Sequence, residues 1–228
     1  MVLLNSKKIL IVAPHADDET LGAGGLLIRA KKMGIKIYWL LITSPNKNIF
    51  SREYINKHEI QIKKVKKFYG FSGLHKLHYP SADLEQISKA KIINSIQEGI
   101  KKYEPDTIIL PHIADAHSDH YITHVCCMAA CKIFKLNSMG LKKIYSMEVL
   151  SETDIFTSKK DYQFQPNTWV DISNSLNDKI TAFKFYKTEI QKDGPRSPER
   201  IKHQAQYNGV PLGWKAAERF CLLNSIED

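Results

Sequence analysis

Cysteine is scarce in this chain, with four cysteines among 228 residues. Three of them, Cys126, Cys127 and Cys131, lie in one apolar segment, where cysteine behaves as a small buried hydrophobe. No pair has the C-x-x-C spacing of a zinc ribbon or a redox site. The cysteines therefore argue against a disulfide-stapled secreted scaffold and are interpreted as core residues.

Long apolar runs are also lacking, since none approaches the 18 residues that a transmembrane helix needs. Near the N-terminus, Lys7 and Lys8 interrupt the apolar residues, and no basic segment precedes a long apolar one as in a secretory signal. We therefore expect a cytoplasmic protein with no stable membrane insertion.

Acidic residues are fewer than basic ones, since the chain has 24 Asp and Glu against 33 Lys and Arg, a net charge of +9. A basic surplus is compatible with nucleic acid, an anionic membrane or an anionic small substrate. Much of it falls in segments 57–67, 89–102 and 132–143. These resemble solvated lysine faces with few interleaved aromatic residues, so we expect no nucleic-acid partner.

Short apolar runs alternate with amphipathic segments along the whole chain. Strands are predicted at residues 8–13, 36–43, 74–79, 106–111, 143–150 and 169–172. Helices are predicted after the first strand, at 54–69 and 87–103, through the cysteine-rich segment, and at 177–191. The pattern predicts an α/β fold, a Rossmann-like three-layer α/β/α sandwich with a mostly parallel sheet. Residues 1–228 are expected to form a single domain.

A glycine-rich segment follows the first predicted strand but does not match a dinucleotide-binding motif. Gly22, Gly24 and Gly25 are present, whereas the G-x-G-x-x-G pattern would need glycine at the position of Leu27. The same turn holds carboxylates, which would repel a pyrophosphate. These glycines are therefore predicted to allow close packing of the helix.

Two polar clusters follow buried strands, at the carboxyl ends of the strands, where α/β proteins bind ligands. The first is His15-Ala16-Asp17-Asp18-Glu19, and the second runs from His112 to His124. His15 and Asp18 are three residues apart, and His120 from the second cluster could complete a catalytic metal site. Asp17 would then be the general base, although the carboxylates could also simply cap the following helix.

The second cluster leaves the roles of its histidines open. One of His117 and His120 could bind metal while the other faces a substrate oxygen, and Asp119 could fix an imidazole tautomer. His124 is interpreted as a packing or substrate-side residue. Four other histidines are interpreted as surface or hydrogen-bonded residues: His58, His75, His78 and His203.

The segments PHADDE (14–19) and HSDH (117–120) resemble the two motifs of the PIG-L/LmbE family of metal-dependent N-deacetylases. The family's first motif is usually A-H-P-D-D-E, and Ala16 here replaces a proline that supplies no ligand. The resemblance extends to Pro195-Arg196-Ser197, Tyr207-Asn208-Gly209, Gly213 and Ala217-Glu218-Arg219-Phe220.

The resemblance implies removal of the acetyl group from an N-acetylated amino sugar, which is free, nucleotide-linked or lipid-linked. His15, Asp18 and His120 would bind Zn²⁺, with Fe²⁺ or another divalent metal as alternatives. Asp17 would accept a proton from the attacking water. Protonated His117, supported by Asp119, would stabilise the oxyanion. Either Asp17 or His117 would protonate the leaving amine.

Arg52 and Arg196 are the candidate substrate-binding residues, and either could attract an anionic group on the sugar. A related amidase that cleaves a larger acyl or thiol conjugate is the first alternative function. A basic nucleic-acid-binding module is a distant one, and homo-oligomer formation is left open.

Overall fold

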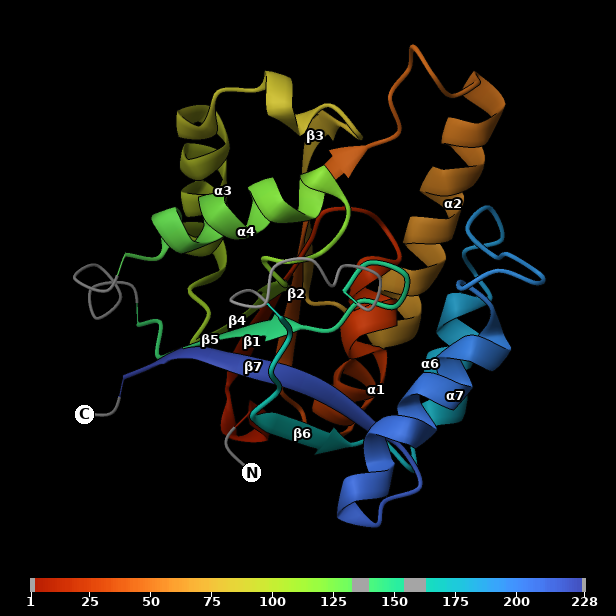
Figure 1. The fold of residues 1–228 in the computed structure, drawn as a ribbon. Helices are drawn as coiled ribbons and strands as arrows, with labels where there is room; N and C mark the ends of the chain where they lie inside the picture. Colours follow the sequence, from red (N-terminus) through yellow and green to blue (C-terminus); the bar gives the residue numbers. More distant parts are fainter. Residues whose placement is uncertain (1–2, 133–139, 154–162, 227–228) are drawn as a thin grey trace.

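Seven strands form one sheet in the order β3-β2-β1-β4-β5-β7-β6 (Figure 1). The computed structural model describes residues 3–132, 140–153 and 163–226. The strands are β1 (Lys8–Ala13), β2 (Lys36–Ser44), β3 (Gly73–Pro80), β4 (Thr107–Pro111), β5 (Lys143–Met147), β6 (Thr168–Asp171) and β7 (Ala217–Ser225). The α-helices are α1 (Asp18–Lys32), α2 (Arg52–Tyr69), α3 (Lys89–Tyr103), α4 (Ser118–Ala130), α6 (Leu176–Phe183) and α7 (Pro198–Gly209). Short 3₁₀ turns are η1 (Leu3–Asn5), η2 (Leu84–Gln86) and η4 (Val210–Leu212).

Most strand pairs are parallel. Strand β1 pairs with β2 and β4, β2 pairs with β3, and β4 pairs with β5, all in parallel. The C-terminal strand β7 runs antiparallel between β5 and β6. The predicted mostly parallel sheet is therefore confirmed, with one antiparallel strand, β7, near one side.

The two faces of the sheet bury alternate residues of each central strand. Ile9 and Ile11 belong to a core that includes α1, α2, α6 and α7, whereas Leu10 and Val12 belong to a core that includes α3 and α4. Figure 1 shows these helices on opposite sides of the sheet. The predicted three-layer sandwich is confirmed, and the continuous apolar run of β1 follows from its burial on both faces.

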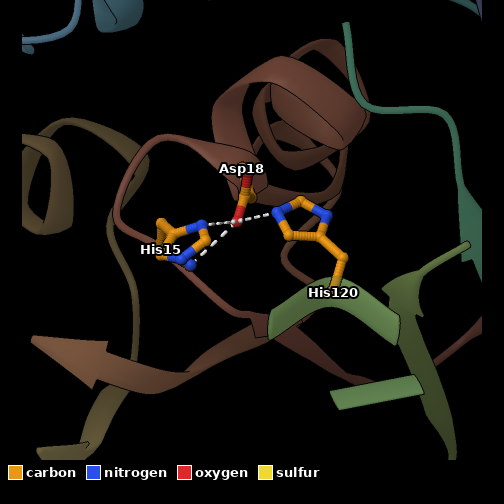
Figure 2. A group of neighbouring side chains, drawn as sticks. All are labelled: His15, Asp18 and His120. Atoms are coloured by element: carbon orange, nitrogen blue, oxygen red, sulfur yellow. Dashed lines mark hydrogen bonds and ion pairs between the residues drawn. The ribbon is translucent and has the colours of Figure 1, made fainter. Parts of the chain in front are cut away.

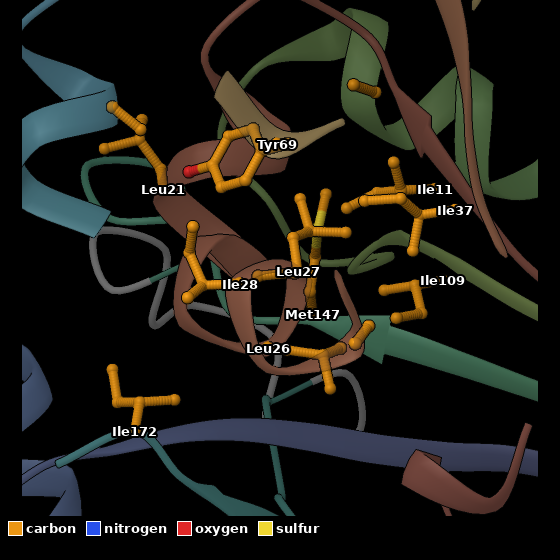
Figure 3. Packing of buried hydrophobic residues seen from close by; sticks show 14 of the residues in the cluster. Ile11, Leu21, Leu26, Leu27, Ile28, Ile37, Tyr69, Ile109, Met147 and Ile172 are labelled. Carbon is orange, nitrogen blue, oxygen red and sulfur yellow. The ribbon is translucent and has the colours of Figure 1, made fainter. Parts of the chain in front are cut away.

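Helix α1 packs closely against its neighbours at its glycines. Figure 3 shows apolar residues of the surrounding core, Met147 and Ile172 among them. A Cβ on Gly22 would lie 2.6 Å from Sδ of Met147, and one on Gly25 would lie 2.5 Å from Cγ2 of Ile172. Both distances are too short for real contacts, so these positions need glycine. The glycines serve helix packing, as the sequence predicts.

Some expected elements differ from those observed. The helix expected at 177–191 ends at Phe183, because the chain turns to bury Tyr186, whose hydroxyl donates to Glu19 Oε1 at 2.7 Å. Residues 133–139, which belong to the basic segment 132–143, and residues 154–162 lie outside the described residues. Within the described part of the chain, no helix is long and apolar enough to cross a membrane.

Candidate metal centre

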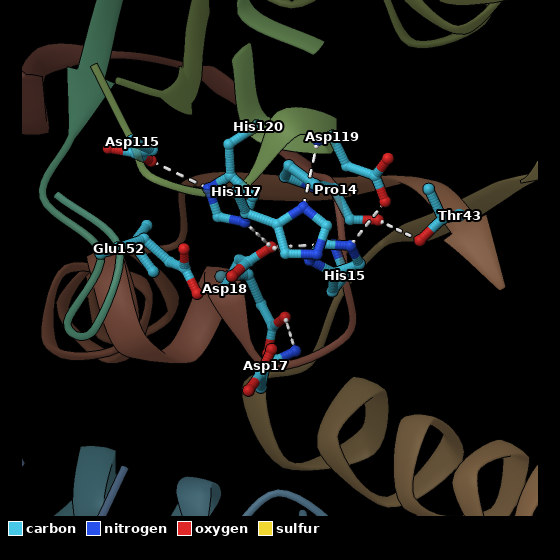
Figure 4. Close-up of polar contacts among 12 residues, drawn as sticks. Pro14, His15, Asp17, Asp18, Thr43, Asp115, His117, Asp119, His120 and Glu152 are labelled. Carbon is cyan, nitrogen blue, oxygen red and sulfur yellow. Dashed lines mark hydrogen bonds and ion pairs between the residues drawn. The ribbon is translucent and has the colours of Figure 1, made fainter. Parts of the chain in front are cut away.

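The two histidine-rich segments meet at the carboxyl ends of neighbouring strands. Strand β1 pairs with β4, and the loops that follow them lead into α1 and α4. The loop after β1 carries His15 and Asp17, and Asp18 is the first residue of α1. The first turn of α4 carries Asp119 and His120. Figure 4 shows these side chains converging between the two helices. The parallel pairing of β1 and β4 therefore brings together residues about 100 positions apart in the chain.

His15, Asp18 and His120 form a compact cluster (Figure 2). One ligand atom from each residue lies within 4.8 Å of the others. The Oδ2 atom of Asp18 is 3.5 Å from Nδ1 of His15 and 3.3 Å from Nε2 of His120. Asp18 and His120 are fully buried, whereas the His15 side chain is 19% exposed. The cluster is thus accessible from the side of His15.

Two buried atoms of this cluster have no hydrogen-bond partner among the described residues, namely Oδ1 of Asp18 and Nε2 of His120. A buried polar atom without a hydrogen bond is costly, and a bound ion or water is a common explanation for one. Two imidazole nitrogens and a carboxylate oxygen suit Zn²⁺ and also Fe²⁺. The three residues therefore fit a divalent transition-metal ion.

Neighbouring carboxylates orient both imidazoles of the cluster. Nδ1 of His120 lies 2.9 Å from Oδ2 of Asp115, whose other oxygen accepts a 2.6 Å hydrogen bond from Thr153. Nε2 of His15 lies 2.9 Å from Oδ2 of Asp119. Each pair leaves the second ring nitrogen facing Asp18, an arrangement common around protein metal ions.

The same contacts determine the pKa values in the cluster. Burial lowers the pKa of His15, but hydrogen bonds to Asp119 and Asp18 outweigh it and raise the pKa to about 9. For Asp18, burial acts to raise the pKa, yet the charges of His120 and His15 hold it well below its ordinary value. The carboxylates therefore stabilise positive charge at the place where a cation would sit.

Asp17 occupies a strained turn beside the cluster. Its φ of 144° lies in a region that residues other than glycine rarely adopt. Its backbone N–H donates to Oε2 of Glu19 at 3.1 Å, which helps to hold this conformation. Burial and the neighbouring Asp18 raise the pKa of Asp17, and Arg196, 3.4 Å away, opposes the shift. Strained residues of this kind concentrate at functional sites.

His117 lies at the N-terminus of α4 and faces His15, with 4.5 Å between the ring centroids. Its Nδ1 accepts a 3.1 Å hydrogen bond from the backbone N–H of Asp119, so a neutral ring carries its proton on Nε2. Burial, followed by the nearby positive His15, lowers the pKa of His117 to about 4.

A cavity of about 290 Å³ opens beside the cluster. His15, Asp17 and His117 line it, together with Arg196 and residues from the first turns of α2. Atoms that could bind a cation, the strained carboxylate and a cationic side chain therefore meet at one cavity.

The PIG-L family profile, described as GlcNAc-PI de-N-acetylase, matches residues 10–131. The chain belongs to the PIG-L family. Diacetylchitobiose deacetylase of Thermococcus kodakarensis is 23% identical over 199 residues, which cover 82% of this chain and 72% of that protein.

Solved structures share the fold of this PIG-L chain. N,N'-diacetylchitobiose deacetylase from Pyrococcus horikoshii superposes with a TM-score of 0.77 at 18% identity, covering 96% of this chain and 85% of that one. The 4-carboxy-2-hydroxymuconate hydratase GalB from Pseudomonas putida gives 0.76 at 12% identity, with 97% and 98% covered. At these identities the similarity establishes the fold and leaves the reaction to the site residues.

Not all predicted contacts around the PIG-L motifs are observed. The Asp119 carboxylate was expected to support His117, but it contacts His15 and accepts backbone hydrogen bonds from Ala82 at 2.7 Å and Leu84 at 3.3 Å. His117 instead contacts the Asp119 backbone, because a residue that caps a helix folds back over its first turn. The burial that lowers the pKa of His117 acts against the protonated ring that the resemblance implies, which stays a prediction.

The two candidate substrate-binding arginines of the PIG-L chain are placed differently. Arg196 lines the cavity, where its guanidinium contacts Asp17, Glu152 at 2.7 Å and Ser151 at 2.8 Å. Arg52, the first residue of α2, is exposed and does not line the cavity. Only Arg196 is brought to the site.

Two cavity residues on α2 were missed or misinterpreted from the sequence. Tyr54 and His58 lie one turn apart on α2 and line the cavity, and the Tyr54 hydroxyl donates to Glu189 at 2.8 Å. His58, interpreted as an isolated histidine, is only 6% exposed. Their i, i+4 spacing on the helix that follows the second strand was the available signal.

Proposed function

We propose that this chain is a metal-dependent hydrolase that removes the acetyl group from an N-acetylated amino sugar. One observation carries the proposal: Asp18 and His120 each keep a buried atom without a hydrogen bond in the described part of the chain, next to His15, which lines a cavity together with Asp17. Membership of the PIG-L family and the diacetylchitobiose deacetylase relative support an amino-sugar substrate.

His15, Asp18 and His120 would hold the ion, with Zn²⁺ and Fe²⁺ as the candidates. A bound ion would polarise the acetamide carbonyl and make an attacking water more acidic. Asp115 and Asp119 keep the two imidazoles in the required tautomers through their 2.9 Å contacts.

Asp17 is assigned the transfer of the proton. Burial and the neighbouring Asp18 raise its pKa and make its carboxylate a stronger base than an exposed aspartate, while the charge of Arg196 acts in the opposite direction. After accepting a proton from the attacking water, Asp17 would pass it to the leaving amine. His117 is less suited to this step, because its Nδ1 is already occupied as an acceptor.

His117 is assigned the stabilisation of the developing oxyanion, as a neutral donor from Nε2. Its ring lies beside His15 at the cavity wall. Arg196 also lines the cavity, beside Asp17, and would face the substrate there. Three carboxylates lie within 4.0 Å of its guanidinium, those of Asp17, Glu152 and Glu189, so its charge is already largely balanced.

Acetate release from a panel of N-acetyl sugars tests the function. The panel would contain free N-acetylglucosamine, diacetylchitobiose and phosphate-bearing N-acetylglucosamine conjugates, each assayed before and after treatment with a chelator. We expect release from at least one sugar, its loss on chelation and its recovery with added Zn²⁺ or Fe²⁺. An unchanged rate after complete metal removal would contradict the proposal, and faster cleavage of bulkier N-acyl analogues would favour the amidase alternative.

A further inference from the structure

Helix α1 is bent five residues after Asp18. Ala23 has φ −139° and ψ 15°, which is not helical, although regular helix lies on both sides of it. A bend interrupts the backbone hydrogen bonds of a helix and exposes their donors and acceptors. Because α1 is buried around the bend, these groups need other partners.

Two side chains distant in sequence supply those partners. The carboxylate of Glu218, on β7, accepts hydrogen bonds of 2.8 Å from the backbone N–H groups of both Gly25 and Leu26. The ammonium of Lys179, on α6, donates to the carbonyl of Leu21 at 2.8 Å. The bend therefore has acceptors on its C-terminal side and a donor on its N-terminal side.

Lys179 and Glu218 also contact each other, at 2.7 Å between Nζ and Oε1, and each side chain is 3% exposed. A buried pair of charges pays a desolvation cost, and apolar residues of similar volume often replace such pairs without loss of stability. This pair is distinguished by its hydrogen bonds to the backbone groups that the bend leaves unpaired. Gly24 provides the space, since a Cβ there would lie 2.9 Å from Cγ of Lys179.

The short segment before the bend, residues 18–22, carries Asp18 and follows directly on Asp17. It is held by further contacts, from Tyr69 to Thr20 at 3.1 Å and from Tyr186 to Glu19 at 2.7 Å. A change in the bend would turn this segment and move the Asp18 carboxylate relative to His120, which is fixed separately on α4.

We propose that Lys179 and Glu218 are positioning residues, which hold the bend of α1 and thereby set Asp18 in place for its role in the candidate metal centre. The role of Asp18 rests on the proposed function, whereas the bend and its partners do not. Neither side chain lines the cavity beside His15.

The test compares Glu218→Gln with the matched control Glu148→Gln. Glu148 is also a buried glutamate, but its carboxylate contacts Arg219 and Asn208 and makes no described hydrogen bond to α1. An amide at position 218 can no longer accept from both backbone N–H groups while facing Lys179. Three quantities are measured: amide hydrogen exchange of Gly25 and Leu26, Co²⁺ affinity with its visible spectrum, and kcat and KM for acetate release.

For Glu218→Gln we expect exchange at Leu26 to accelerate about tenfold or more, because its hydrogen bond is lost. Co²⁺ affinity should fall about tenfold and the Co²⁺ spectrum should change, as for other residues that orient metal ligands. The loss of activity should appear in kcat, with KM within about twofold of wild type. Glu148→Gln should leave exchange at Leu26 and the Co²⁺ spectrum as in wild type.

Faster exchange with unchanged Co²⁺ affinity and kcat would overturn the positioning role, as would equal losses in Glu148→Gln. If Glu218→Gln does not fold, Lys179→Met carries the test. It removes the donor to the Leu21 carbonyl and leaves the Glu218 carboxylate as the acceptor for the N–H groups of Gly25 and Leu26. Failure of the wild-type protein to bind Co²⁺ is a different result, which would overturn the proposed metal centre and the positioning role that depends on it.

Discussion

Asp17 is the residue on which the proposed chemistry depends most directly. It combines burial, a raised pKa and a strained backbone at the wall of the cavity. A residue selected only to cap α1 would need none of these, and its side chain makes no capping hydrogen bond. Its features therefore favour proton transfer over helix capping.

Asp17→Asn should retain the metal and lose about 100- to 10,000-fold in kcat, because an amide cannot accept the proton. Asparagine has almost the same shape and volume as aspartate, so the turn should be preserved. Acetate-release kinetics and metal analysis of the purified protein measure the two effects. Asp178→Asn is the control, since Asp178 pairs with Lys32 on the surface. Near-normal turnover of Asp17→Asn would exclude Asp17 as the base.

Arg196 and Arg52 offer a second comparison at the residue scale. Arg196→Met removes the only described cation within 4.0 Å of the Asp17 carboxylate and should lower kcat/KM about tenfold or more. Arg52→Met changes an exposed side chain outside the cavity and should leave kcat/KM unchanged. Steady-state kinetics on one substrate measure kcat/KM for both variants. Equal losses in both variants would contradict the assignment of Arg196.

At the scale of elements, α1 joins the site to the core. Its N-terminal turn follows the strained Asp17, its glycines touch Met147 and Ile172, and its bend is held from α6 and β7. The helix is therefore constrained on several sides, so adding even a methyl group to it should change the free energy of unfolding.

Gly25→Ala should destabilise the protein by about 1–3 kcal/mol, because the new methyl group would overlap Ile172. Gly99→Ala on α3 is the matched control. There a Cβ would lie 3.1 Å from Leu40, a milder contact that the gain in helix propensity of about 1 kcal/mol offsets. Urea unfolding at constant metal concentration measures both. Equal stability of the two variants would show that α1 can move away from Ile172.

At the scale of the whole molecule, the C-terminal part of the chain cannot be separated from the sheet. Strand β7 lies between β5 and β6, and its Glu218 bonds to α1. Residues near both ends thus share one sheet and one set of hydrogen bonds, which supports the proposal that the chain forms a single domain.

Calorimetry should accordingly give one cooperative unfolding transition, with calorimetric and van't Hoff enthalpies that agree. The metal-free protein is the appropriate sample, since a bound ion would shift the transition by mass action. Two resolved transitions would contradict the single-domain prediction.

The amino-acid sequence was sufficient for the main features of the fold and for the core of the candidate site. Apolar runs of strand length alternating with amphipathic helices specify the α/β layers, since period and burial are local properties of the chain. His15, Asp17 and Asp18 lie within four residues, and His120 follows the strand that pairs with β1. Parallel strands present their carboxyl ends at one edge, so this convergence could be predicted.

Contacts that depend on packing between distant segments were decided only by the tertiary structure. The sequence offered Arg52 and Arg196 as alternatives, and the course of the chain after α6 brings only Arg196 to the cavity. The partner of the Asp119 carboxylate is His15, 104 residues away, rather than its neighbour His117. Glu218 accepts a hydrogen bond from Gly25 of α1, which is 193 residues away in the chain. Local periodicity specifies which residues are buried, whereas the relative placement of helices and loops determines which buried groups meet.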